Sequence, residues 1–108
     1  MFGIVPYICT NSLFQQKNHV IYTNRAQAKI KQNKFQDAID DCKEAIKLKQ
    51  DNLKTYAIIV RALRGMKDYQ KALDTLEVAE QIPNVDIRLL KEIRQETIKE
   101  MKAYLQNN

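Results

Sequence analysis

The sequence predicts an all-α fold, a solenoid of antiparallel helix pairs, and three observations lead to this prediction. Glycine and proline number only two each among 108 residues, so the chain offers few of the tight turns that β-sandwiches and barrels need. Apolar residues instead recur at spacings of three and four, which is the period of one helix face. The chain also matches itself after a shift of 34 residues, and such a period is typical of stacked helical units.

The two shifted copies agree where residues are aromatic or small. Tyr22 coincides with Tyr56, and Phe35 coincides with Tyr69. The small positions pair Ala28 with Ala62, Ala38 with Ala72, and Ala45 with Ala79. Antiparallel helices approach to roughly 8–10 Å only where the side chains at their crossing are small. We therefore expect these alanines to lie at the helix crossings, with the aromatic rings beside them.

Each copy is expected to form a helix, a short turn and a second helix. In the first copy the helices are predicted over 20–32 and 35–48, with the turn at Asn33 and Lys34. In the second copy the turn is predicted at 67–68, after a helix whose end Gly65 loosens.

Residues 86–105 are predicted to form one long helix with Asp86 as its N-cap. One face of this helix is apolar, and the other is polar and carries Arg88, Lys91, Glu92, Gln95, Lys99 and Lys102. A helix of this kind covers the apolar end of a solenoid, so we interpret it as a cap. The alternative is a helix that docks a partner.

The N-terminal residues look like part of an earlier helix pair. Residues 7–17 have the spacing of a second helix, and a matching first helix is missing. The expected organisation is a partial unit over 1–18, helix pairs over 19–52 and 53–84, and the cap over 85–108. Self-association through the exposed N-terminal edge is a further expectation.

The charge and cysteine content limit the classes of partner. The net charge is +5 and the pI about 9.2, which suits an acidic partner, nucleic acid or an anionic surface. The lysines are spread along the chain without a nucleic-acid motif, so we expect no nucleic acid, and no stretch approaches the ~20 apolar residues of a membrane span. Cys9 and Cys42 form no CxxC pair, and two free thiols favour a cytoplasmic location.

The residues that catalysis or metal binding would need do not gather in the sequence. His19 is the single histidine, and no Ser-His-Asp or Cys-His pattern surrounds it. Asp40 and Asp41 are adjacent, so they diverge on a helix and are placed on its exterior. Two glycines cannot supply a phosphate-binding loop. We therefore expect neither an enzyme nor a metal or other cofactor.

Two stretches, YTNRAQAKIKQNKFQDAIDDCKEAIKL and TYAIIVRALRGMKDYQKALDTLEVAEQIPN, resemble the tetratricopeptide-repeat (TPR) family over residues 19–84. The proline that the family places near the end of each repeat is present as Pro83, whereas Gln50 stands at that place in the first copy. The resemblance implies a right-handed solenoid whose first helices line a concave groove that binds another protein. The groove positions it implies are Val20, Asn24, Gln27 and Lys31 in one helix and Lys54, Ile58, Arg61 and Gly65 in the next.

The segment YTNRA is similar to that of chaperone-binding TPR proteins, which hold the C-terminal Glu-Glu-Val-Asp tail of heat-shock chaperones in a carboxylate clamp. The clamp's asparagine corresponds to Asn24 and one of its lysines to Lys54, but its arginine corresponds to Ile58. Two further members lie on a helix that this sequence lacks, and Arg61 partly substitutes. IYTNRAQA is also similar to a TPR protein of axonemal dynein-arm preassembly. Two functions stay open, a chaperone-associated adaptor that binds an acidic peptide and a structural helical subunit that contacts other subunits of a larger assembly.

Overall fold

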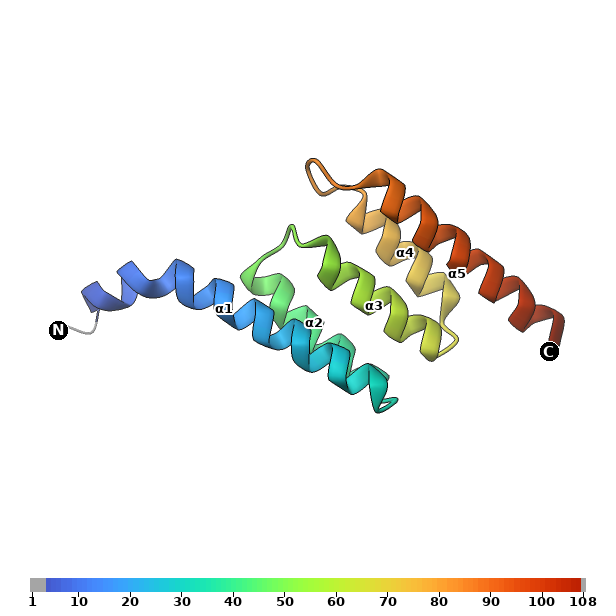
Figure 1. Cartoon of the computed structure of the whole chain (residues 1–108), viewed down its shortest axis with the longest axis horizontal. Helices are drawn as coiled ribbons and strands as arrows, with labels where there is room; N and C mark the ends of the chain where they lie inside the picture. Colours follow the sequence, from blue (N-terminus) through green and yellow to red (C-terminus); the bar gives the residue numbers. More distant parts are fainter. Residues whose placement is uncertain (1–3, 108) are drawn as a thin grey trace.

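The computed structural model describes the backbone of residues 4–107 and the side chains of residues 18–107. Within these residues the chain forms α-helices and no strand, which confirms the all-α prediction. The helices are α1 (Ile4–Lys31), α2 (Phe35–Leu48), α3 (Leu53–Gly65), α4 (Tyr69–Ala79) and α5 (Ile87–Asn107). They succeed one another along an elongated molecule of 62 × 31 × 16 Å (Figure 1).

The 34-residue period is visible in the backbone of the turns. Asn33 and Lys67, which are equivalent positions, both have left-handed conformations, with φ of 62° and 65°. In each turn the following amide bonds back to a carbonyl five residues earlier, Lys34 to Lys29 at 2.8 Å and Asp68 to Leu63 at 2.9 Å. This is the hydrogen bond of a helix C-terminus closed by a left-handed residue. The two copies therefore turn in the same way.

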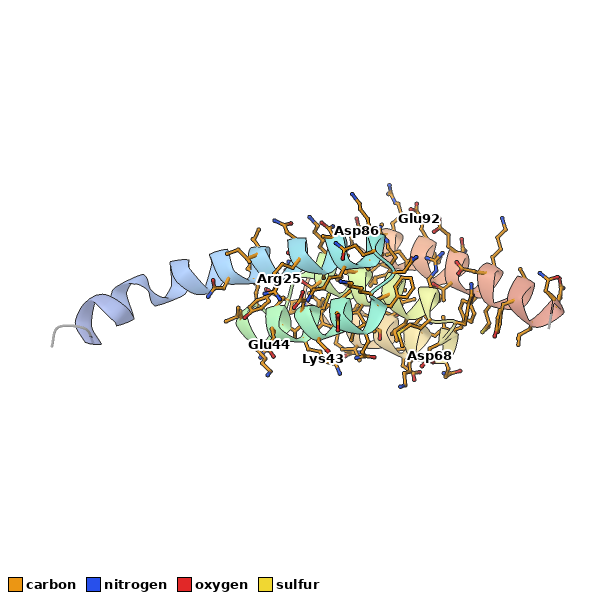
Figure 2. All side chains as sticks on the ribbon, turned by 90° about the horizontal axis from the view of Figure 1, so that it is seen from below. Arg25, Lys43, Glu44, Asp68, Asp86 and Glu92 are labelled. Carbon is orange, nitrogen blue, oxygen red and sulfur yellow. The ribbon has the colours of Figure 1, made fainter. Side chains whose placement is uncertain are left out.

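The helices alternate between two sides of the molecule. Helix α3 contacts α1, α2 and α4, while α4 also contacts α5. In Figure 1, α1 and α3 run in the same direction, and Figure 2 shows α1 and α5 on one side and α2 on the other. The arrangement is that of stacked antiparallel pairs, with α1, α3 and α5 as the first helices of successive units.

The core consists largely of the predicted small residues. Ala38, Ala45, Ala62, Ala72 and Ala79 are completely buried, as are Ala26 and Cys42. The prediction is wrong for Ala28, which is exposed. Its equivalent Ala62 lies on the face of α3 that turns toward the preceding helix pair, and among the described residues no such pair covers α1.

The N-terminal region differs from the expectation in its backbone. We predicted a helix over 7–17 that is separate from the next, but α1 is continuous from Ile4 to Lys31. Residues 7–31 contain neither glycine nor proline, so nothing in the sequence interrupts helical hydrogen bonding there. The side chains of residues 1–17, on which the interpretation as a partial repeat depends, lie outside the described residues.

Helix α5 begins where the sequence predicts. The Asp86 side chain accepts a hydrogen bond from the Leu89 amide at 3.2 Å, which confirms Asp86 as the N-cap. Leu90 and Thr97 are buried, and Arg94 pairs with Glu80 at the end of α4. The residues of the predicted polar face, Arg88, Lys91, Glu92, Gln95, Lys99 and Lys102, are all exposed.

Candidate peptide-binding surface

A buried carboxylate on α2 fixes the position of α1. The Asp41 side chain is only 8% exposed, and its oxygens lie 2.9 Å from Lys29 Nζ and 3.4 Å from Arg25 Nη2. Arg25 also stacks over the Tyr22 ring at 5.6 Å. The sequence interpretation placed both aspartates on the helix exterior, which holds for Asp40 and is wrong for Asp41. Its cations come from another helix, so neighbouring residues in the sequence gave no signal of this pairing.

A second polar contact joins α1 to the start of α3. His19 belongs to α1 and is buried, and its Nδ1 lies 3.5 Å from the side-chain amide nitrogen of Asn52. The Asn52 oxygen accepts a hydrogen bond from the Lys54 amide at 3.1 Å and so caps α3. His19 and Asn52 thus fix where α3, which begins at Leu53, starts relative to α1. The two residues are 33 apart in the sequence, so local spacing carries no signal of this contact.

The predicted groove positions of α1 and α3 form two short rows. Asn24 and Lys31 are seven residues apart on α1, and Lys54 and Arg61 are seven apart on α3, so each pair lies on one face, about 10 Å apart along its helix. All four side chains are exposed, and Gln27 between the first two is half-buried. No described side chain forms an ion pair with Lys31, Lys54 or Arg61, so their charges are available to a ligand.

Ile58 does not belong to this surface. It is 3% exposed and lies in the hydrophobic core cluster, so its assignment as a groove residue is wrong. Its equivalent in the first copy is Asn24, which is exposed because no described helix covers that side of α1. Two positions that are equivalent in the repeat therefore differ in burial. The difference arises because helices cover Ile58, whereas no described helix covers Asn24.

The charge of the two helices has one sign. The sequences of α1 and α3 contain no aspartate or glutamate, but both carry lysine and arginine. On α2 and α4 acidic residues outnumber basic ones. The charged residues that α1 and α3 contribute to this surface are thus all basic, which favours an acidic ligand.

The far end of the molecule is held by Glu100 of α5. Its Oε2 accepts hydrogen bonds from Arg64 of α3, and its Oε1 accepts one from the Tyr69 hydroxyl of α4 at 3.2 Å. Burial alone would raise the pKa of Glu100, but the Arg64 contacts, the Tyr69 hydroxyl and the Lys67 charge together lower it. The pKa of Tyr69 is raised by burial and by the Glu100 charge. These contacts lock α5 against both α3 and α4.

The one remaining group with potential chemistry among the described side chains is the buried thiol of Cys42. Burial, with a smaller effect of the Asp41 charge, raises the pKa of Cys42 to about 12, so its thiol is protonated at neutral pH. Within residues 18–107 no cluster of three or more His, Cys, Asp or Glu side chains has metal-site geometry. Among the helices described, none is long and apolar enough to cross a membrane.

Antiparallel helix pairs with a 34-residue period and a repeated turn define a helical-repeat protein, the class that binds other proteins through stacked helices. The profile of the family "Tetratricopeptide repeat" matches residues 19–52, and the chain belongs to this family of protein–protein interaction modules.

Curated relatives support the same family. The chain is 38% identical over 88 residues to Tetratricopeptide repeat protein 12 of Mus musculus, a match that covers 81% of this chain and 12% of the relative. It is 40% identical over 57 residues to Sperm-associated antigen 1 of Homo sapiens, covering 53% of this chain and 6% of the relative. The Mus musculus form of that antigen is 29% identical over 100 residues, covering 92% and 10%. The chain therefore spans only a small part of these relatives. No solved structure matches it significantly.

Proposed function

We propose that the surface of α1 and α3 binds an acidic C-terminal peptide, and that the chain acts in the cytoplasm as part of a chaperone-associated adaptor. The observation that carries this proposal is the charge of the surface. Lys31, Lys54 and Arg61 are exposed and unpaired among the described side chains, on two helices whose sequences contain no acidic residue.

A terminal carboxylate needs several converging donors to offset its loss of hydration. Lys54 supplies a charged ammonium at the start of α3. Asn24 supplies a neutral amide on the open side of α1, the side whose equivalent in α3 is buried. Arg61 lies two turns along α3 from Lys54 and takes the place of the arginine that the buried Ile58 cannot provide. Gln27 and Lys31 extend the row toward the end of α1.

Titration with a fluorescent peptide ending in Glu-Glu-Val-Asp tests the proposal. We expect binding on the order of micromolar affinity, weakened by salt because the contact is largely ionic. Binding should be lost with the C-terminally amidated peptide and with the Lys54→Ala variant. Lys43→Ala is the matched control, since Lys43 is an exposed lysine on the opposite face (Figure 2). Equal affinity for the free and amidated peptides, or no binding at all, would rule out the clamp.

A structural subunit of a larger assembly is the second candidate function, and the open side of α1 favours it. Ile21 is 52% exposed, and Asn24 and Ala28 are also exposed on this side. Their equivalents in α3 are Thr55, Ile58 and Ala62, which are all buried. This side of α1 therefore corresponds to the side of α3 that packs against another helix pair.

Sedimentation equilibrium over a range of concentrations distinguishes the two ways of covering this side. A dimer that Ile21→Glu dissociates would show self-association through α1. A monomer at all concentrations would indicate that a different protein covers this side. The basic charge of α1 favours this outcome, since two α1 helices would repel each other.

A further inference from the structure

A recess lies on the face opposite the candidate peptide surface, between α2 and α4. Its volume is about 360 Å³, and it is lined by Gln36, Ile39 and Lys43 of α2, Ile59 and Leu63 of α3, and Lys71, Asp74, Thr75 and Val78 of α4. In Figure 2, Lys43 and Asp68 project from this face, whereas Asp86 and Glu92 project from the opposite one. We call this recess the outer groove.

The floor of the outer groove is aliphatic. Ile39, Ile59 and Leu63 are nearly buried members of the hydrophobic core, and all three line the groove. Val78 at the rim is 54% exposed. A ligand that enters the groove would therefore meet a continuous apolar surface at the bottom and one side.

Two residues that line the groove differ in type from their equivalents in the other copy of the repeat, and the fold does not require the difference. The equivalent of Val78 in the first copy is Glu44, a surface residue that pairs with Lys47 at 3.0 Å. The equivalent of Lys43 in the second copy is Glu77, which is also exposed. Because the same helix position accepts a glutamate in the other copy, packing of the repeat does not explain a valine at 78 or a lysine at 43.

Most polar groups around the groove already have partners. Asp74 accepts a hydrogen bond from Gln70 at 3.1 Å, and Thr75 donates to the Lys71 carbonyl at 2.8 Å. The Lys71 ammonium lies 3.7 Å from Asp68. The ammonium of Lys43 differs, because no ion-pair or hydrogen-bond partner for it exists among the side chains of residues 18–107. A single uncommitted cation thus stands beside an aliphatic floor.

We propose that the outer groove binds an amphipathic helix of a partner protein, which inserts an aliphatic side chain between α2 and α4 and presents a carboxylate to Lys43. Residues three or four apart on a helix are neighbours, so one helix face supplies both groups. The α1 helix of a second copy does not fit this description, because it carries no acidic residue to meet Lys43. The proposal is independent of the peptide surface on α1 and α3.

The test is a selection of phage-displayed helical peptides, each of about 16 residues so that a helix forms readily, on the whole chain. Lys43→Glu and Val78→Glu serve as counter-selection targets. Each variant installs the residue found at the equivalent position of the other copy, so both are expected to fold, which thermal melts by circular dichroism verify. Lys54→Ala is the control for the opposite face.

The expected result is a set of peptides with aliphatic and acidic residues at helical spacing. Their affinity should fall about tenfold or more in each glutamate variant, as for a residue central to an interface, and should not change in Lys54→Ala. Peptides that bind both variants as tightly as the unchanged chain, or no selected peptide that distinguishes them, would overturn the proposal. A dimer of the chain alone that Val78→Glu dissociates would assign the groove to a second copy instead and would likewise overturn it.

Discussion

The Arg64 guanidinium donates two hydrogen bonds to one carboxylate oxygen of Glu100, from Nε at 3.0 Å and from Nη2 at 2.6 Å. Because the other oxygen accepts from Tyr69, a single side chain of α5 is tied to α3 and α4 at once. Residues Ile87 to Asn107 thus form a helix whose far half is held by polar contacts. Stability in this part of the molecule should therefore depend on the charge of Glu100.

Glu100→Gln is expected to lower the free energy of unfolding by about 1 kcal/mol at neutral pH, a value already reduced for the partial exposure of the pair. The lowered pKa of Glu100 means that its charge stabilises the fold above the ordinary glutamate range, and that this contribution is lost as pH falls through the folded-state pKa. Urea unfolding from about pH 7 down to about pH 3 should show the two proteins converging in acid. Glu96→Gln is the matched control, because Glu96 lies 3.9 Å from Arg64 and is mostly exposed. An equal effect of both substitutions would contradict the role of Glu100.

Gly65→Ala should destabilise the protein although alanine favours helices. A methyl group at Gly65 would lie 2.5 Å from the Phe35 ring, and the ring must move to admit it. Alanine gains about 1 kcal/mol of helix propensity over glycine, whereas overpacking costs about 1–3 kcal/mol, so we expect a net loss of roughly 1 kcal/mol by urea unfolding. In the Phe35→Leu background the loss should disappear, since the smaller side chain leaves room. A loss of the same size in both backgrounds would show that the ring is not its cause.

Asp41→Asn should weaken the packing of α1 against α2, and so lower stability, more than Asp40→Asn does. Removing the buried charge leaves Lys29 and Arg25 without their counter-ion, and we expect a loss of about 2 kcal/mol, less than for a fully buried pair because both cations reach solvent. Asp40→Asn removes an exposed charge and keeps an oxygen that can accept the Gln36 hydrogen bond, so it should change stability by less than about 0.5 kcal/mol. Thermal melts of the two variants side by side provide the comparison. Similar melting temperatures for both would refute the buried pairing.

Ile58→Arg would introduce the arginine that the proposed carboxylate clamp lacks, but it should not create a clamp. Ile58 is buried in the core, so a charged side chain there should lower the free energy of unfolding by about 3 kcal/mol or more. Ile58→Val, which keeps the apolar contact, should lower it by only about 1 kcal/mol. Chemical denaturation measures both. A stable Ile58→Arg protein with tighter binding of the Glu-Glu-Val-Asp peptide would show that position 58 can reach the groove.

The candidate site was only partly predictable from the sequence. The resemblance to the TPR family implied Asn24, Lys31, Lys54 and Arg61 as surface positions, and all four side chains are exposed. It did not separate Ile58 from them, since burial there depends on the helices that pack against α3. The aliphatic floor of the outer groove gave no signal at all, because core residues that line a recess have the same spacing as core residues that do not.

The sequence by itself determined the helices after Asn33, the turn positions and the Asp86 cap, since all of these depend on neighbours within about one helical turn. The tertiary structure decided which residues of each stripe are covered. Asn24 is exposed while its equivalent Ile58 is buried, and Asp41 is paired while Asp40 faces water. The physical reason is that burial and ion pairing are properties of the space between helices, and that space is filled by residues distant in the sequence.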